Sequence, residues 1–245
     1  MHIITFLWSR RLFMYLLAKS FFRVLAPFNK NLERLYKVFF QKYIEIGNNI
    51  LKRKKFGKFV FWMRDRDVYS LLEVFIDKDY ALVDDFLPKM GNIILDLGAG
   101  IGDYTLLSSL RVGRKGKVVS IEADARTYKI LLKNVKENGL KNVIALNIFI
   151  SSETGQNLDS IVKKLGLRRV DLIKMDIEGE EYNAIKGAVE TIMRFKPKII
   201  VEIHSKKLRD RILKLIKRYD YSLVLEKEKR GHGFYLHYFK CMQRY

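Results

Sequence analysis

The sequence predicts an α/β fold, namely a doubly wound, mostly parallel, seven-stranded sheet that ends in a C-terminal antiparallel hairpin. Two observations predict it. From about residue 91 to the C-terminus, short apolar runs alternate with segments of helical periodicity. The last two apolar runs, 221–225 and 234–239, have no helix between them and are joined through Gly231 and Gly233, which favours a hairpin.

The expected elements follow from apolar spacing and from the positions of turn residues. Helices space their apolar residues three or four apart, whereas buried parallel strands are nearly continuous apolar runs. Residues 67–88 indicate two short helices ahead of the first strand. The expected strands are 93–96, 117–121, 142–150, 170–176, 198–204, 221–225 and 234–239, and the expected helices are 103–111, 124–138, 158–165, 180–194 and 205–219.

The 245-residue chain is expected to have two parts, a basic and apolar helical extension at 1–63 and the α/β domain at 64–245. The first thirty-two residues contain no acid and combine many aromatic residues with several Lys and Arg. Their longest apolar run, Leu12 to Ala18, is too short to span a bilayer. One hypothesis is that residues 1–30 form an interfacial helix on an anionic membrane. A helix packed on the domain or on a second copy is an equal alternative.

The formal charge of +20, from 47 Lys and Arg against 27 acids, raises the question of a nucleic-acid partner. The basic residues are distributed over expected helix surfaces, as in 206–217, which is typical of a solvated face. Nucleic acid is therefore not the favoured partner. The lone cysteine, Cys241, excludes an intrachain disulfide and suits a reducing cytoplasm, with at most peripheral contact to the inner membrane face.

The stretch 93–102 carries the most specific motif, because Gly98, Gly100 and Gly102 lie two apart between an expected strand and an expected helix. Glycine permits a tight turn and a close approach of the backbone to a ligand. A dinucleotide fingerprint would need its third glycine at the position of Asp103. A carboxylate there would repel a pyrophosphate but suits the positive sulfonium and amino groups of S-adenosylmethionine (SAM). The motif therefore favours SAM over NAD.

A second strand, 117–121, ends in Glu122, whose carboxylate can accept hydrogen bonds from both hydroxyls of a ribose. A glycine turn that binds nothing is the alternative, and it is disfavoured by the presence of Asp96 and Glu122 together. The residues expected to bind the cofactor here are Asp96, Gly98, Ala99, Gly100, Gly102, Tyr104, Glu122 and Ala123.

Methyl transfer to a hydroxyl needs alignment of the reactants and removal of a proton. Acids and a histidine follow two neighbouring strands: Asp176 and Glu178 after one, Glu202 and His204 at the end of the next. Asp176 is expected to be a general base or to orient the substrate, and capping of the next helix is an equal alternative. His204 is the other candidate base, because an ordinary imidazole titrates near neutrality.

Two further expectations concern the same strands. Asp176, Glu202 and His204 could hold Mg²⁺ or Mn²⁺, but their spacing does not require an ion, so no metal is predicted. Lys174 lies within the fourth strand, and its ammonium group is expected to pair with Glu202 on the adjacent strand.

Four blocks of the sequence resemble the FkbM-type methyltransferases, in the right order over about residues 64–204. They are DLGAGIGDYT at 96–105, the segment 121–140, VDLIKMDIEGEEYNAIKG at 170–187 and KPKIIVEIH at 196–204. The resemblance implies a class I, Rossmann-like domain that methylates a hydroxyl of a sugar, glycolipid or other small metabolite with SAM. Many relatives carry an acid after the third strand, near the adenine. This chain has Ser151 and Ser152 there, so a serine hydroxyl or a backbone carbonyl is expected to replace the acid.

Missing motifs disfavour nucleic-acid acceptors. Methylation of a base amine commonly uses an Asn/Asp-Pro-Pro-aromatic loop after the fourth strand, whereas residues 176–179 are Asp-Ile-Glu-Gly. Carbon methylation of pyrimidines needs a nucleophilic cysteine, and Cys241 lies in the C-terminal tail. An RNA methyltransferase is thus the second hypothesis. A SAM-binding protein without catalysis is the third, and the acids at 176, 178 and 202 argue against it.

Overall fold

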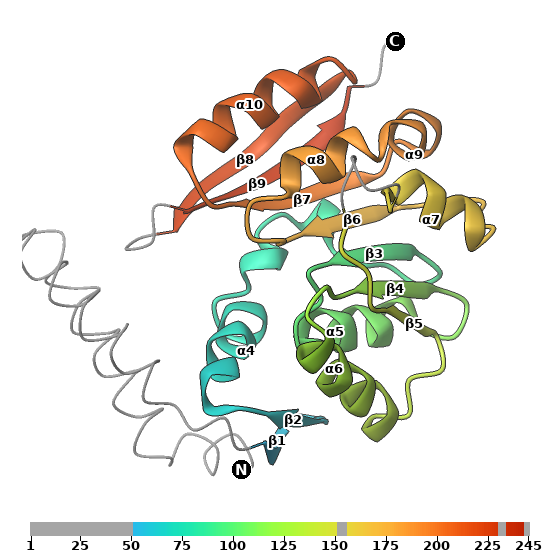
Figure 1. Ribbon diagram of the computed structural model, residues 1–245, viewed down its shortest axis with the longest axis vertical. Coiled ribbons are helices and arrows are strands. Elements are labelled where there is room, and N and C mark those ends of the chain that lie inside the picture. Colours follow the sequence, from blue (N-terminus) through green and yellow to red (C-terminus); the bar gives the residue numbers. More distant parts are fainter. Residues whose placement is uncertain (1–50, 151–155, 230–233, 243–245) are drawn as a thin grey trace, which may run out of the picture. The chain divides into compact units, whose positions relative to one another are not determined.

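A computed structural model of the chain describes residues 51–150, 156–229 and 234–242 (Figure 1). The chain divides into two units, of which the first ends at Tyr69 and the second spans Ser70–Tyr245. The predicted boundary after residue 63 lies within the first unit. The predicted interfacial helix at 1–30 and the glycine turn at 231–233 lie outside the described residues.

The described part of the first unit contains an antiparallel hairpin of β1 (Lys52–Phe56) and β2 (Phe59–Met63), followed by a 3₁₀ turn, η2 (Asp65–Asp67). The prediction that this segment is helical is wrong for residues 52–63. The sequence Phe-Val-Phe-Trp-Met of β2 is rich in aromatic and β-branched residues, and these favour a strand.

The second unit contains a seven-stranded sheet with the strand order β5-β4-β3-β6-β7-β9-β8. The pairs within β5-β4-β3-β6-β7 are all parallel, and β9 runs antiparallel to both β7 and β8. The predicted fold class is therefore confirmed, including the C-terminal hairpin. The strands are β3 (Ile93–Leu97), β4 (Lys117–Ile121), β5 (Val143–Leu146), β6 (Leu172–Met175), β7 (Lys198–Ile203), β8 (Tyr221–Lys229) and β9 (Phe234–Cys241).

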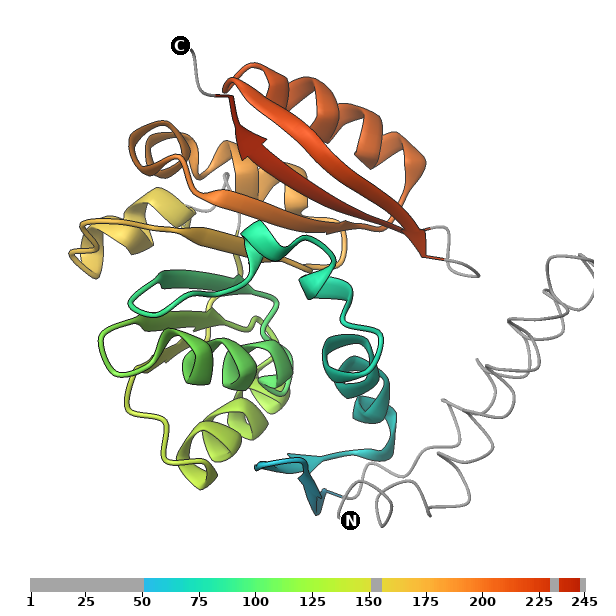
Figure 2. The ribbon, with the colours of Figure 1, turned by 180° about the vertical axis from the view of Figure 1, so that it is seen from behind.

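Helices cover both faces of the sheet: residues of α7–α10 pack on one face, and residues of α4 and α5 pack on the other (Figures 1 and 2). Only the first of the two short helices expected before β3 forms; two 3₁₀ turns, η3 (Asp79–Ala81) and η4 (Asp84–Phe86), replace the second. The helices are α4 (Val68–Phe75), α5 (Asp103–Val112), α6 (Ala125–Glu137), α7 (Leu158–Lys164), α8 (Glu181–Lys186), α9 (Val189–Phe195) and α10 (Lys206–Lys217). Within the described ranges, none of the helices combines the length and the apolar character that a bilayer crossing needs.

The single helix predicted over 180–194 is two helices, α8 and α9, separated at Gly187 and Ala188. The carboxylate of Asp159 accepts hydrogen bonds from the backbone N–H groups of Glu190 and Thr191, at 2.9 and 2.7 Å. These two donors belong to the first turn of α9, where backbone N–H groups have no partner within the helix. The apolar pattern predicts one continuous helix here. Asp159, which is distant in sequence, instead stabilises the start of a second helix, α9.

Two apolar cores, one on each face of the sheet, hold this unit together. Successive side chains of a strand point to opposite faces, so Leu95 and Leu97 pack towards α7–α10, whereas Ile94 packs towards α4 and α5. Both sets are fully buried. The parallel strands therefore end at one edge of a rigid sheet, and the residues that follow β3, β4, β6 and β7 are gathered there.

Candidate active site

The glycine loop after β3 is shaped by contacts that exclude larger residues. Gly98 has a φ of +70°, and a Cβ there would lie 1.7 Å from the backbone oxygen of Asp176. Gly102 has a φ of +94°, and its Cβ would lie 2.7 Å from Leu131 Cδ1. Gly100, at +55°, has open space beside it. Gly98 thus allows the loop after β3 to touch the loop after β6.

The backbone of this loop fixes the carboxylate of Glu122. Its Oε2 accepts a hydrogen bond from Gly100 N at 2.8 Å, and its Oε1 accepts one from Asp124 N at 2.9 Å. Burial raises the pKa of Glu122, while these two hydrogen bonds lower it, and the net direction is upward. Each carboxylate oxygen has a second lone pair, so Glu122 can still accept hydrogen bonds from a ligand.

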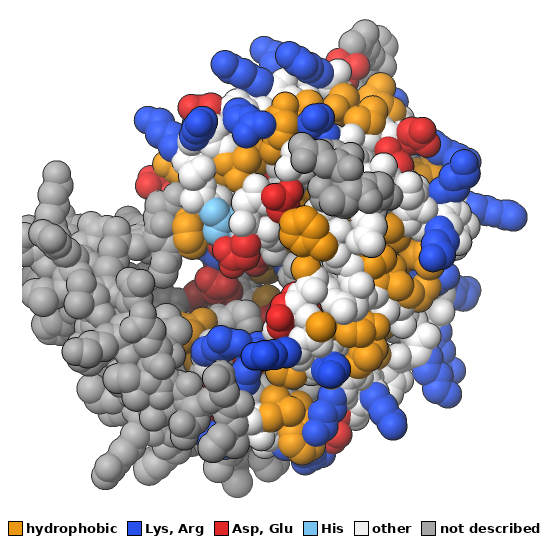
Figure 3. Space-filling view, in the orientation of Figure 1, with side chains coloured by type: hydrophobic (Ala, Val, Ile, Leu, Met, Phe, Trp, Pro, Cys, Tyr) orange, Lys and Arg blue, Asp and Glu red, His pale blue; other side chains and the backbone are white. Residues whose placement is uncertain are grey.

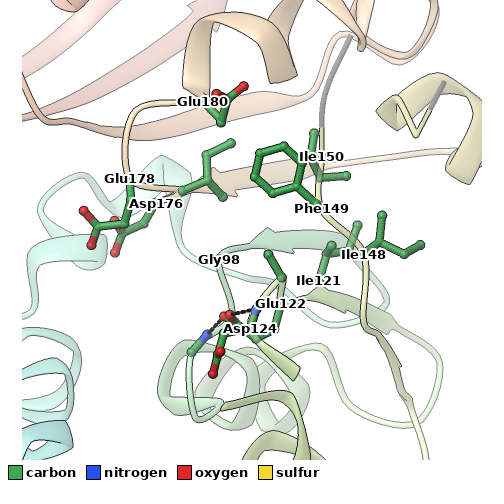
Figure 4. Close-up of a pocket in the computed structure, with 13 residues that line it drawn as sticks. Gly98, Ile121, Glu122, Asp124, Ile148, Phe149, Ile150, Asp176, Glu178 and Glu180 are labelled. Carbon is green, nitrogen blue, oxygen red and sulfur yellow. Dashed lines mark hydrogen bonds between the residues drawn. The ribbon is translucent and has the colours of Figure 1, made fainter. Parts of the chain in front are cut away.

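A pocket of about 540 Å³ opens at the carboxyl ends of β3, β4 and β6. This volume is within the range of roughly 300–1,000 Å³ that is common for ligand sites. Figure 4 shows apolar side chains on one side, from the segment after β5, and Asp176 and Glu178 on the other, with Glu122 at the glycine loop. The lining residues are Gly98, Gly100, Ile121, Glu122, Ala123, Asp124, Ile148, Phe149, Ile150, Asp176, Ile177, Glu178 and Glu180.

Four of the residues predicted to bind the cofactor line this pocket: Gly98, Gly100, Glu122 and Ala123. Ala99 and Gly102 belong to the same loop without being among the lining residues. Asp96 is fully buried beneath the loop, and Tyr104 is buried against the ring of Tyr80, with ring centroids 5.3 Å apart. Ser151 and Ser152 lie outside the described residues.

The apolar wall was missed because the third strand was predicted to extend to residue 150. β5 ends at Leu146, and the side chain of Asn147 donates to the backbone oxygens of Glu122 and Ala123, at 2.8 and 3.0 Å. The following residues therefore leave the sheet and face the pocket. Phe149 is half exposed, and this large aromatic side chain just after a strand was the available signal.

The expected pairing of Lys174 with Glu202 is wrong. In the sheet register Lys174 lies opposite Asp96, and its Nζ is 3.3 Å from Asp96 Oδ1. It also donates to the backbone oxygen of Gly98, at 2.8 Å. Burial lowers the pKa of Lys174, but the negative charges of Asp96 and Asp176 outweigh it, and the net direction is upward. Lys174 is therefore a buried cation that supports the glycine loop from below.

The four predicted catalytic residues meet at the ends of β6 and β7. His204 Nε2 lies 3.5 Å from Asp176 Oδ1, 3.6 Å from Glu178 Oε2 and 3.9 Å from Glu202 Oε1. Its Nδ1 lies 3.3 Å from Oε1 of Glu181, which is fully buried. Figure 3 shows acidic side chains gathered around a hollow beside a histidine, whereas Lys and Arg are spread over the surface around it.

Asp176 does not cap the following helix, so that alternative is wrong. α8 begins at Glu181, and its N-terminal cap is Glu180. The loop between β6 and α8 is held instead by Glu181, whose Oε1 accepts from the backbone N–H groups of Ile177 and Gly179, at 3.3 and 3.1 Å. The carboxylate of Asp176 is thereby left to face Tyr80 and His204.

Tyr80 and Lys229 contact the acids, and no sequence pattern predicts either residue. The Tyr80 hydroxyl lies 3.2 Å from both Asp176 Oδ2 and Glu202 Oε2. Lys229, on the C-terminal hairpin, has its Nζ 2.7 Å from Glu202 Oε2 and 3.0 Å from Glu73 Oε1. Neither residue belongs to a local motif. Only the tertiary fold brings these two residues, which are distant in sequence, to the acids.

The electrostatics of the cluster change the assignment of the base. Burial lowers the pKa of His204, but the hydrogen bond to Glu181 and the charges of Asp176 and Glu178 outweigh it and raise the pKa to about 9. Burial, together with the charge of Asp176, raises the pKa of Glu202 to about 7. The expectation that His204 titrates near neutrality is therefore wrong. A pKa raised to about 9 favours the protonated form of His204 at pH 7, which makes this residue a poor general base.

Comparison with known proteins supports a methyltransferase domain. The model of the FkbM methyltransferase domain matches residues 153–223, and that of the TRM5/TYW2 methyltransferase domain matches residues 85–185. A probable cobalt-precorrin-6B C(15)-methyltransferase (decarboxylating) of Sulfurisphaera tokodaii is 28% identical over 109 residues, which cover 42% of this chain and 55% of that protein. Alignments with two further relatives of that description cover 28% and 37% of their length, so this chain spans about half or less of the curated relatives it matches.

Two solved structures share the fold. A SAM-dependent O-methyltransferase of Thermotoga maritima superposes with a TM-score of 0.52 and 20% identity, covering 74% of this chain and 71% of that one. A fibrillarin of Aeropyrum pernix with natively bound SAM superposes with a TM-score of 0.54 and 15% identity, covering 78% and 83%. The solved structures show that this chain has the fold of class I methyltransferases, and both family models match methyltransferase domains over parts of it. The SAM bound in that fibrillarin agrees with the predicted cofactor. The resemblance to FkbM-type methyltransferases is confirmed over residues 153–223.

Proposed function

We propose that this protein transfers the methyl group of SAM to a hydroxyl group of a carbohydrate, a glycolipid or another small metabolite. The observation that carries the proposal is the division of the pocket into an apolar wall and an acidic wall, joined at the glycine loop. The ribose hydroxyls of SAM would bind the fixed carboxylate of Glu122, and the adenine would lie against Phe149 and its neighbours. The sulfonium would then face Asp176, whose negative charge favours it.

In this arrangement Asp176 is the proposed base. The acceptor oxygen attacks the methyl carbon in line, the carbon–sulfur bond breaks, and its electron pair goes to sulfur. The hydroxyl proton passes to the Asp176 carboxylate, which lies at the pocket edge. Glu178, Glu202 and the His204 imidazolium would hold the acceptor by hydrogen bonds. The contact between Gly98 and the backbone of Asp176 sets the distance between cofactor and base.

The charge of the pocket supports a neutral acceptor. Five acids are among its lining residues, and among the described residues that line it there is neither Lys nor Arg. A phosphodiester would be repelled by these five carboxylates, whereas sugar hydroxyls can donate hydrogen bonds to them. RNA methylation is the second candidate, favoured by the match to the TRM5/TYW2 methyltransferase domain and by the formal charge of +20.

The proposal is tested first by calorimetric titration of the full-length protein with SAM and with NAD. We expect one SAM site and no NAD binding; binding of NAD alone would refute the cofactor assignment. Incubation with SAM labelled in its methyl group, together with carbohydrate, lipid and RNA pools, then identifies the acceptor. Label that enters only RNA would replace the proposed function by the second candidate. SAM binding without turnover on any pool would favour the third hypothesis.

We also propose that residues 1–30 bind an anionic membrane. An interfacial helix there would bring the enzyme to a lipid-linked sugar as acceptor. Flotation of the full-length protein with anionic and with neutral vesicles tests this. We expect flotation with anionic vesicles only, and loss of it when Arg10, Arg11, Lys19 and Arg23 are replaced by Gln. Failure to float with either vesicle would remove the membrane partner and leave the proposed reaction unaffected.

A further inference from the structure

We propose that Asp176, Glu202 and His204 form a binding site for one divalent metal ion. Each residue offers one ligand atom, and the three ligand atoms lie within 4.8 Å of one another. His204 Nε2 is 3.5 Å from Asp176 Oδ1 and 3.9 Å from Glu202 Oε1. Ligand atoms about 2.0–2.2 Å from a shared ion are roughly 3–4.4 Å apart, so these separations suit a common ion.

A second observation is that neighbouring side chains contact each proposed ligand and orient it. Metal-binding imidazoles usually donate their other N–H to a carboxylate, which fixes the tautomer and the ring orientation. His204 Nδ1 faces Glu181 Oε1 in this way, at 3.3 Å. Glu181 is fully buried, and in the described part of the chain its Oε2 has no hydrogen-bond partner. The backbone N–H groups of Ile177 and Gly179 also donate to Oε1, so this buried carboxylate is held in place while it faces the imidazole.

The two carboxylate ligands are oriented by the same principle. Tyr80 lies 3.2 Å from Oδ2 of Asp176 and from Oε2 of Glu202. Lys229 also contacts Oε2 of Glu202, at 2.7 Å. In each carboxylate one oxygen is occupied by these donors and the other faces His204. The three facing atoms are therefore preorganised, as a metal site requires.

The local charge favours a cation at this point. Carboxylates of four residues lie within 4 Å of the His204 ring nitrogens, and the Lys229 ammonium is shared between Glu202 and Glu73. Two carboxylates and one imidazole suit Mn²⁺ and Mg²⁺ among common ions. Three protein ligands leave further coordination positions for water or for an acceptor oxygen. The site borders the pocket through Asp176 and Glu178.

The role of the ion rests on the proposed function, although its binding does not. A hydroxyl bound to a divalent ion loses its proton more readily. Asp176 would then serve as a ligand, and the proton would pass to Glu178, which is exposed to solvent on 86% of its side chain. The new oxygen–methyl bond forms as the methyl–sulfur bond breaks, with the electron pair going to sulfur as before.

The test is calorimetric titration of the full-length protein with MnCl₂ in the absence of SAM and acceptor. We expect one site per chain, with affinity at least tenfold lower in Asp176→Asn and His204→Gln. Glu181→Gln should weaken binding roughly 10–100-fold without removing a ligand. Glu180→Gln is the matched control, because Glu180 lines the same pocket but pairs with Asn183, and its affinity for Mn²⁺ should be unchanged.

A spectroscopic measurement keeps the proposal testable if a variant fails to fold. Electron spin-echo measurements on the Mn²⁺ complex of the unsubstituted protein should show modulation from one imidazole nitrogen. Absence of Mn²⁺ binding, binding without nitrogen modulation, or equal affinity in folded His204→Gln would overturn the metal site. SAM binding and methyl transfer are measured separately, so the metal site and the proposed function can fail independently.

Discussion

Replacing Gly98 by alanine tests the contact that joins the two walls of the pocket. The new Cβ would lie 1.7 Å from the backbone oxygen of Asp176 and 2.7 Å from its carbonyl carbon, and backbone atoms cannot swing aside as side chains do. Alanine at a positive φ costs about 1–2 kcal/mol. Overpacking adds typically 1–3 kcal/mol. We therefore expect Gly98→Ala to lose about 2–5 kcal/mol of the free energy of unfolding.

Gly100→Ala is the control, because Gly100 also has a positive φ but no atom within 4 Å of its Cβ position. It should lose only the conformational share, about 1–2 kcal/mol. Urea unfolding, followed by circular dichroism, gives the free energy of unfolding of both variants. The comparison requires that its dependence on urea concentration, the m value, is the same in both. Because relief of the clash must move the loop after β6 away from the glycine loop, Gly98→Ala should also lose more SAM affinity. Equal losses of stability in the two variants would refute this reasoning.

The remaining predictions concern three buried or partly buried charges. Glu122→Gln should weaken SAM binding by roughly tenfold, because charged hydrogen bonds to the ribose are lost; unchanged affinity in calorimetry would show that Glu122 does not bind the ribose. Lys174→Met should cost about 3–5 kcal/mol in urea unfolding, because it leaves the buried Asp96 carboxylate without its cation. Addition of Asp96→Asn should restore part of that loss, and a single variant as stable as the parent would contradict the assignment. Burial raises the pKa of Asp103 to about 6 despite the hydrogen bond from Ser70 and the charge of Lys174. The folded protein therefore binds more protons than the unfolded chain, and its stability should fall by roughly 2–3 kcal/mol as the pH rises from about 4 to about 7; a parallel pH profile in Asp103→Asn would exclude Asp103 as the cause.

The sequence predicted elements best where one local pattern decided the outcome. β4 lies at its predicted residues and β3 ends one residue later than predicted, because each is a short, mostly apolar segment followed by an acid or a glycine loop. The predicted end of β5 is four residues too late, since the apolar run continues but Asn147 turns the chain away from the sheet. Local patterns specify that a residue is apolar. They do not specify whether it faces a core or a ligand pocket.

The residues of the candidate site also fall into two groups, those that local sequence patterns predict and those that they do not. Gly98 and Glu122 follow their strands directly, so parallel strands that end at one edge were enough to bring them together. Tyr80 and Lys229 lie in segments about 150 residues apart, and both contact Glu202. Their approach depends on the position of β9 between β7 and β8 and on the packing of η3, which no local periodicity encodes. Residues that contact the site from distant segments are therefore harder to predict than residues that directly follow the strands.

The arrangement of these supports links cofactor binding to the acidic cluster. Lys174 donates to the backbone of Gly98, and its ammonium group lies 5.3 Å from the centre of the Tyr80 ring. The Tyr80 hydroxyl in turn contacts Asp176 and Glu202. A shift of the glycine loop is thus transmitted to the carboxylates by a cation–ring contact as well as by the direct contact between Gly98 and Asp176. Because a misplacement of about 1 Å can cost a hundredfold in rate, we expect substitutions of Lys174 or Tyr80 to lower the rate of the proposed reaction although neither residue lines the pocket.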